Sequence, residues 1–200
     1  ATGEKNTMES VLDRVIKQNT ENVNLLKTKD YNIFSVLQIQ SKEVLICRMI
    51  ADLLNPRGQH GAGAEYLKIF LRDCLGMEKM DTKLADQAIV TAEYAIDDER
   101  RIDIVIEIGS YFLPIEVKIY AADQKSQCFD YYQYAKRRDA QAKVYYLTLD
   151  GHRPGKDSTS SGSQSVPEED IVCLSFREHI LNWLKACKNC GNTGMIPILE

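Results

Sequence analysis

Three ionisable side chains near the middle of the chain have the types and the spacing that metal-assisted chemistry requires. Asp103 lies in the strand-like run 101–108, whereas Glu116 and Lys118 lie in the strand-like run 111–119. Side chains alternate between the two faces of a strand, so Glu116 and Lys118 share a face. The pattern therefore predicts a carboxylate and an ammonium side by side on one strand, with a second carboxylate on the preceding strand.

A short turn between the two runs predicts how their residues pair. Residues 109–110 read Gly-Ser, and a two-residue hairpin loop that begins with glycine pairs Ile108 with Tyr111. In that register Asp103 lies directly opposite Glu116, with Cβ atoms roughly 4.5 to 5.5 Å apart. Two carboxylates at this distance repel each other, so we expect a cation between them.

Two carboxylates and a lysine are the groups that hydrolysis of a phosphodiester needs. Carboxylate oxygens bind hard cations such as Mg²⁺, which keep coordination positions for water and substrate phosphate. The metal polarises the phosphate and lowers the pKa of water, and the lysine stabilises developing negative charge. The alternative is that Asp103 and Glu116 form salt bridges with Arg101 or Lys118 on an exposed sheet face. Spacing alone leaves both interpretations open.

The residues around these side chains resemble a known nuclease family. Asp103, followed after a short hairpin by Ile115-Glu116-Val117-Lys118, resembles the D…(D/E)xK signature of the PD-(D/E)XK nuclease superfamily. Val117 replaces the usual Asn, and Ile46-Cys47 stand where His-Ser is common. The order of further motifs across about residues 31–150 resembles the bacterial and phage branch: Glu43, Leu53-Leu54-Asn55-Pro56, His60-Gly61, Arg101-Ile102-Asp103-Ile104, Ala122-Asp123-Gln124, Gln127 and Tyr131.

The resemblance implies a set of metal ligands. Asp103, Glu116 and the backbone carbonyl of Val117 would hold Mg²⁺, for which Mn²⁺ would substitute. Glu43 would support the metal directly, through water, or through a second ion. The alternative for Glu43 is a first-turn glutamate that the helix dipole favours.

The resemblance also implies catalytic and accessory roles. Lys118 would orient or help deprotonate the attacking water, and Gln127 would position Lys118 or that water; cleavage would leave 5′-phosphate ends. Four residues complete the candidate site as accessory groups or substrate contacts, of which His60 alternatively orders its loop: Glu93, His60, Gln124 and Tyr131.

Composition limits the classes of protein to which the chain can belong. The 200 residues are 44% hydrophobic, which suits one globular domain with a sizeable core. Twenty-five basic and 29 acidic residues give a net charge of -4, which argues against a protein that grips nucleic acid by bulk electrostatics. A nuclease stays compatible with this charge, because its metal ligands are acidic and bound ions restore positive charge locally.

Features that would indicate a membrane or an export route are missing from this sequence. It has no run of about 18 apolar residues and no signal peptide, so we expect a soluble cytoplasmic protein without membrane association. Ala1-Thr2-Gly3 resembles an expression remnant, and the end soon after Met195-Ile196-Pro197 leaves open a longer protein. The expected partners are DNA and the metal, and a homodimer is left open.

Periodicity along the chain predicts an α/β domain with a restriction-endonuclease-like core. This core is a mixed sheet of four or five strands between helices, in the order helix, three strands, helix, strand. Residues 151–170 are rich in Ser, Gly and charge, and we expect a mobile loop there. Helices are expected over 5–30, 41–54 (capped by Ser41), 64–75, 121–138 and 175–188, and strands over 88–96, 101–108, 111–119, 143–149 and 171–174.

Two functions from different classes fit these observations. The first is a metal-dependent deoxyribonuclease, for which every expected residue type is present. The second is an interaction module for protein or DNA that keeps the fold without the chemistry. Metal affinity that depends on Asp103 separates the two.

Overall fold

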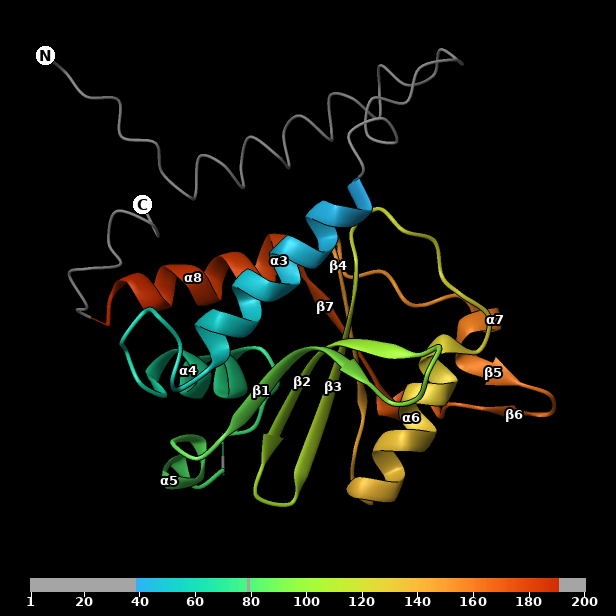
Figure 1. The fold of residues 1–200 in the computed structure, drawn as a ribbon, viewed down its shortest axis with the longest axis horizontal. Coiled ribbons are helices and arrows are strands. Elements are labelled where there is room, and N and C mark those ends of the chain that lie inside the picture. The colour runs from blue at the N-terminus through green and yellow to red at the C-terminus, as the bar shows by residue number, and fades with distance from the viewer. Residues whose placement is uncertain (1–38, 79, 191–200) are drawn as a thin grey trace, which may run out of the picture.

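The computed structural model describes residues 39–78 and 80–190, and in this part of the chain a five-stranded sheet lies between helices (Figure 1). The strand order is β1-β2-β3-β4-β7. The first three strands pair antiparallel, whereas β3, β4 and β7 run parallel. The strands are β1 (Ile89–Ala95), β2 (Arg101–Ile108), β3 (Tyr111–Lys118), β4 (Val144–Thr148) and β7 (Ile171–Ser175).

Helices cover both faces of the sheet, which explains why β3 and β4 are buried along nearly their whole length. On one face lie α3 (Ile39–Leu54), α4 (Glu65–Asp73) and α8 (Leu181–Lys188). On the other face lies α6 (Gln127–Arg138) (Figure 1). The larger core cluster joins the first three helices to the sheet through residues such as Leu54, Phe70, Ile104, Ile106 and Trp183.

The central hairpin has the predicted register. Ile108 pairs with Tyr111, and the pairing continues to Ile104 opposite Ile115. Gly109 begins the turn with φ +57°, a left-handed conformation that glycine adopts without steric cost. The fold class expected from the sequence is confirmed, with five strands in the described sheet.

Two helices begin at other residues than expected. Helix α3 begins at Ile39, so Ser41 lies inside it and does not cap it. Helix α6 begins at Gln127 and not at Ala121, and Ser126 immediately before it has φ +57°. The residues just before Gln127 therefore form a loop, which leads from β3 into the helix.

Residues 151–170, where a mobile loop is expected, contain short elements that the sequence did not predict. They form α7 (Lys156–Thr159), the hairpin β5 (Ser160–Ser161) with β6 (Gln164–Ser165), and the 3-10 turn η1 (Glu168–Asp170). Val166 is buried and packs in a cluster with Tyr132 of α6. One valine and several backbone hydrogen bonds thus anchor this polar segment, and its mobility stays a prediction.

The remaining elements are short. Helix α5 (Thr82–Ala85) lies between α4 and β1 and is capped by Asp81, whose carboxylate accepts the Lys83 N–H at 2.9 Å. A π-helical turn, η2 (Phe176–Ile180), leads from β7 into α8. The expected helix over 5–30 and the ends of the chain lie outside the described residues.

Candidate active site

The hairpin places the three central side chains at one end of the sheet. Asp103 is the third residue of β2, and Glu116 and Lys118 lie at the end of β3. Because β2 and β3 are antiparallel, the start of one strand lies beside the end of the other. The described backbone pairing ends at Ile104 and Ile115, immediately before Asp103 and Glu116.

Asp103 is held by the neighbouring strand. Its Oδ2 accepts the backbone N–H of Val117 at 2.7 Å. The carboxylate thus replaces a backbone carbonyl as the acceptor for β3, at the point where the backbone pairing of the two strands has ended. Burial raises the pKa of Asp103, although this hydrogen bond and the Lys118 ammonium lower it. The bond fixes the direction of the carboxyl group and leaves Oδ1 available for another partner.

Glu116 is a buried carboxylate that the described residues satisfy only in part. Its side chain is 1% exposed, and Lys118 Nζ lies 2.6 Å from Oε1 as an ion pair. Oε2 has no hydrogen-bond donor among the described residues. Burial raises the pKa of Glu116 well above its ordinary range, and the carboxylate of Asp103 raises it further. Such a group is costly to bury unless a cation completes its surroundings.

Lys118 faces the same carboxylates. Burial lowers the pKa of its ammonium group, but the carboxylates of Glu116, Asp103 and Glu43 more than offset that effect, so its pKa lies above the ordinary value. Lys118 therefore stays charged beside Glu116. It is a cation placed where a phosphate would bring negative charge.

These groups open into a cavity of about 240 Å³ at the end of the sheet. The cavity has the oxygen donors that Mg²⁺ prefers, namely two adjacent carboxylates, one of which has an oxygen without a hydrogen-bond donor. Within residues 39–78 and 80–190 no three His, Cys, Asp or Glu side chains form a complete metal cage, so water or backbone oxygen would supply further ligands. The lining includes Glu43, Val44, Glu99, Arg100, Arg101, Asp103, Glu116, Val117, Lys118, Gln124, Gln127 and Tyr131.

Glu43 reaches this cavity from α3. Its side chain is buried, and Oε1 accepts the backbone N–H of Ile119 at 2.6 Å and that of Tyr120 at 3.4 Å. These two residues follow Lys118 directly. The geometry thus shows Glu43 holding the backbone after β3, in addition to lining the cavity.

Gln127 and Tyr131 form a hydrogen-bonded chain on α6. The hydroxyl of Tyr131 donates to the carbonyl of Arg101 and accepts a hydrogen bond from Gln127 Nε2 at 3.0 Å. A carbonyl only accepts, so the tyrosine oxygen must be the acceptor toward Gln127, and this fixes the orientation of the amide. Gln127 Oε1 is buried and has no partner among the described residues. It presents an acceptor to the lysine or to water.

Gln124 lies in the cavity wall, but not on the helix where the sequence placed it. Its Oε1 accepts a hydrogen bond from Arg100 Nη1 at 2.9 Å. The same guanidinium binds Asp130 at 3.1 Å and the carbonyl of Lys125 at 2.6 Å. Arg100 therefore ties the loop before α6 to the start of β2. Sequence reasoning missed it, although an arginine beside Arg101 and an acidic residue in the first turn of α6 were visible signals.

Glu93 and His60 do not line the cavity. Glu93 pairs with Arg48 of α3 at 2.6 Å, and it has φ +54° within β1. His60 Nδ1 accepts the Ala62 N–H at 3.1 Å, its Nε2 lies 2.9 Å from the carbonyl of Asn55, and its ring stacks on Tyr66. His60 thus orders the loop after α3, which was the alternative considered for it.

Comparison with protein families supports the interpretation that this geometry suggests. The model described as the PD-(D/E)XK nuclease superfamily matches residues 31–195. The chain belongs to the PD-(D/E)XK nuclease superfamily. Members of this superfamily typically use a divalent metal, and the oxygen groups around Glu116 suit one. Comparisons with curated proteins and with solved structures found no significant match.

Membership of the nuclease superfamily confirms the resemblance first seen in the Asp103 and Glu116-Val117-Lys118 motif. It indicates phosphodiester hydrolysis as the class of chemistry. Within the described residues no helix is both long and apolar enough to cross a bilayer.

Proposed function

We propose that this member of the nuclease superfamily is a divalent-metal-dependent deoxyribonuclease. Glu116 is the observation that carries the proposal. It is buried beside Asp103, its Oε1 is engaged by Lys118, and its Oε2 has no hydrogen-bond donor among the described residues. A protein tolerates such a group where its function uses it, because burial of an unsatisfied charge costs several kcal/mol.

In the proposed enzyme Asp103, Glu116 and the carbonyl of Val117 hold the metal. A bound Mg²⁺ or Mn²⁺ would polarise the scissile phosphate and lower the pKa of the attacking water. Lys118 contributes a fixed positive charge to the phosphate as negative charge develops on it, and it orients the water. Its ion pair with Glu116 keeps the ammonium on this side of the sheet.

Gln127 supports this arrangement as an acceptor. Because Tyr131 fixes the amide, the free oxygen of Gln127 can accept a hydrogen bond from Lys118 or from the attacking water. Glu43 keeps the backbone at Ile119 in place and stands close enough to the carboxylates to support the ion. One chain supplies every group, so the proposal does not require a homodimer.

The first test compares cleavage of supercoiled, linear and branched DNA in Mg²⁺, Mn²⁺ and EDTA. We expect the parent chain to cut in either metal and not in EDTA, and Asp103→Ala and Lys118→Ala to abolish cutting. The alternative is a catalytically silent module with the nuclease fold. No cutting by the parent, together with calorimetry that shows no Asp103-dependent metal binding, would establish that alternative.

A further inference from the structure

Two adjacent arginines line the cavity, and their surroundings differ. Arg100 donates three hydrogen bonds, to Asp130, Gln124 and the carbonyl of Lys125, so the structure occupies its guanidinium. The side chain of Arg101 is exposed, and across the described ranges no hydrogen bond or ion pair engages its guanidinium. Arg101 therefore presents an unused planar cation at the cavity.

The base of the Arg101 side chain is nevertheless fixed. Its backbone pairs with Ala95 of β1, and its carbonyl accepts the hydroxyl of buried Tyr131. Arg101 precedes Asp103 by two residues, so both side chains leave β2 on the same face. A rigid strand thus carries a free guanidinium beside the carboxylates that would hold the metal.

The charges around the cavity show why a nucleic acid would need this cation. Carboxylates of Glu43, Glu99, Asp103 and Glu116 line the cavity, and the whole chain carries a net charge of -4. Lys118 faces inward and pairs with Glu116.

Two of the three basic residues at the end of α6 are held in ion pairs within the fold, and the third, Arg137, lies over the ring of Tyr134 and does not line the cavity. Lys136 pairs with Asp170 at 3.2 Å, and Arg138 pairs with Glu107 at 2.6 Å. These residues brace α6 against its neighbours. They leave Arg101 as the cavity-lining guanidinium that is available to a ligand.

We propose that Arg101 binds a phosphate of the DNA backbone next to the phosphate that is cleaved. This rests on the proposed nuclease function. A guanidinium forks onto two oxygens of one phosphate, which suits a contact that positions the strand without reading its sequence. Arg101 would therefore set the register of the strand over Asp103, Glu116 and Lys118.

The test measures equilibrium binding of a fluorescent DNA duplex in Mg²⁺, over a range of salt concentrations, with Lys118→Ala as the background that prevents turnover. Arg101→Ala should weaken binding by about fivefold to tenfold near 0.1 M salt. It should also make the slope of log K against log salt shallower by about 0.9. Arg101→Lys should keep the parent slope and bind about twofold to threefold more weakly, because it retains the charge and loses the fork.

Lys83→Ala is the matched control. Lys83 is an exposed cation on α5, beside the turn at the opposite end of the hairpin from the cavity. It should leave both affinity and slope unchanged. Thermal midpoints of the Arg101 variants should stay within about 2 °C of the background, since the substituted side chain is exposed.

The outcomes separate this inference from the proposed function. Binding by Arg101→Ala with the affinity and slope of the background, or an equal loss in Lys83→Ala, would overturn the phosphate contact even if the parent chain cuts DNA. A salt slope that depends on Arg101, in a parent chain that never cuts DNA, would keep the contact and reject the nuclease.

Discussion

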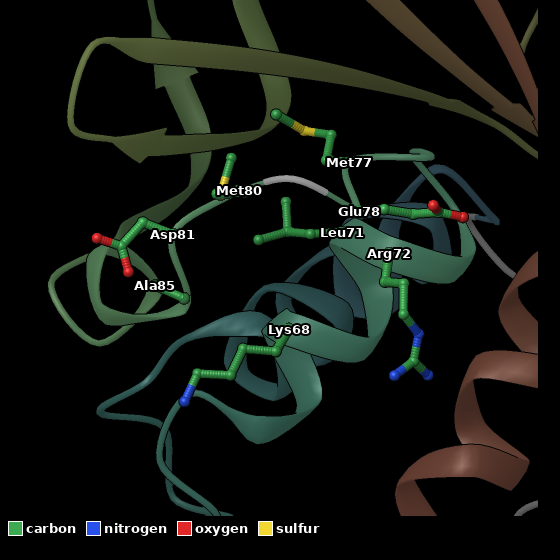
Figure 2. Close-up of a pocket in the computed structure, with 8 residues that line it drawn as sticks. All are labelled: Lys68, Leu71, Arg72, Met77, Glu78, Met80, Asp81 and Ala85. Atoms are coloured by element: carbon green, nitrogen blue, oxygen red, sulfur yellow. The ribbon is translucent and has the colours of Figure 1, made fainter.

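Two cavities of this protein differ in the burial and pairing of their ionisable groups. The cavity at the end of the sheet contains Glu116, which is buried and whose Oε2 has no hydrogen-bond donor among the described residues. The other cavity, of about 120 Å³ beside α4 and α5, is apolar at its centre, where Leu71, Met77 and Met80 lie close together (Figure 2). The charged groups of its lining lie around this centre, and Arg72, for example, binds its neighbour Asp73.

The difference supports the sheet-end cavity as the proposed active site. Charges at α4 are paired locally and exposed, so they contribute little to stability and leave no group in need of a ligand. The charged side chains at the sheet end are buried and incompletely hydrogen-bonded. Their burial lowers the stability of the folded protein until a metal ion binds. The presence of a cavity does not distinguish the two places. The burial and hydrogen bonding of their polar groups do.

The difference between the two cavities is tested most strongly by neutralising one carboxylate in each. Glu116→Gln should lower kcat/KM for DNA cleavage by at least about 10³-fold, because it removes a metal ligand worth several kcal/mol in the transition state. Glu78→Gln, in the lining of the second cavity, should retain the parent activity. Cleavage by Glu116→Gln at near-parent rates would mean that the sheet-end cavity is not the active site.

Metal binding should stabilise the protein through the first cavity alone. At a free Mg²⁺ concentration of about 100 times Kd, the free energy of unfolding should rise by about 2.7 kcal/mol, and EDTA should reverse the gain. Urea titrations of the parent, Glu116→Gln and Arg72→Ala with and without Mg²⁺ would check this. The gain should vanish in Glu116→Gln and persist in Arg72→Ala; equal gains in all three would place the metal elsewhere.

Glu43 tests how the first cavity is held together. Glu43→Ala removes the acceptor for the Ile119 and Tyr120 N–H groups and should lower kcat about 10-fold to 100-fold. Glu43→Gln keeps an oxygen acceptor and should lose less. Calorimetric Mg²⁺ titration of both variants separates positioning from ligation, since loss of affinity in both would make Glu43 a ligand.

The smallest expected effect is a pH dependence of opposite sign at the two cavities. The pKa of Glu116 is raised in the folded metal-free protein, so the folded state holds its proton longer and stability falls as pH rises above about 4.3, by at most about 1.4 kcal/mol per unit. The pKa of Asp73 is lowered by Arg72, so its small contribution is lost as pH falls through its folded-state pKa. Urea unfolding between pH 4 and 8 would measure this, and Glu116→Gln should flatten the first trend while Asp73→Asn leaves it intact.

Much of the fold and the centre of the site could be predicted because they depend on local patterns. Alternation and a Gly-Ser turn sufficed for the hairpin register, and that register brought Asp103 to Glu116. The salt-bridge alternative is met in part, since Lys118 does pair with Glu116. That pair engages Oε1 and leaves Oε2 without a hydrogen-bond donor among the described residues, so it satisfies the carboxylate only in part.

What could not be predicted depends on contacts between distant residues. Gln124 recurs at helical spacing with Gln127, yet Arg100 holds it in a loop, and no local pattern records that bond. Glu93 was placed near the metal by its position in the motif, but Arg48 of α3 pairs with it. Residues 151–170 looked unanchored because their partners lie on α6, about 30 residues earlier in the chain.

The same contacts also affect what proteolysis of residues 151–170 would do to the protein. Ser126, just before α6, binds the segment twice, with its N–H donating to the Asp157 carbonyl at 2.7 Å and its hydroxyl to the Ser160 carbonyl at 2.8 Å. The loop that contains Gln124 is thus hydrogen-bonded to a segment whose sequence resembles an exposed loop of the kind that proteases cut. Trypsin does not cut the Arg153–Pro154 bond, but cleavage after Lys156 would release that hold. We expect this nick, more than 25 residues from Gln127, to lower the activity of the proposed nuclease without changing a residue of its site.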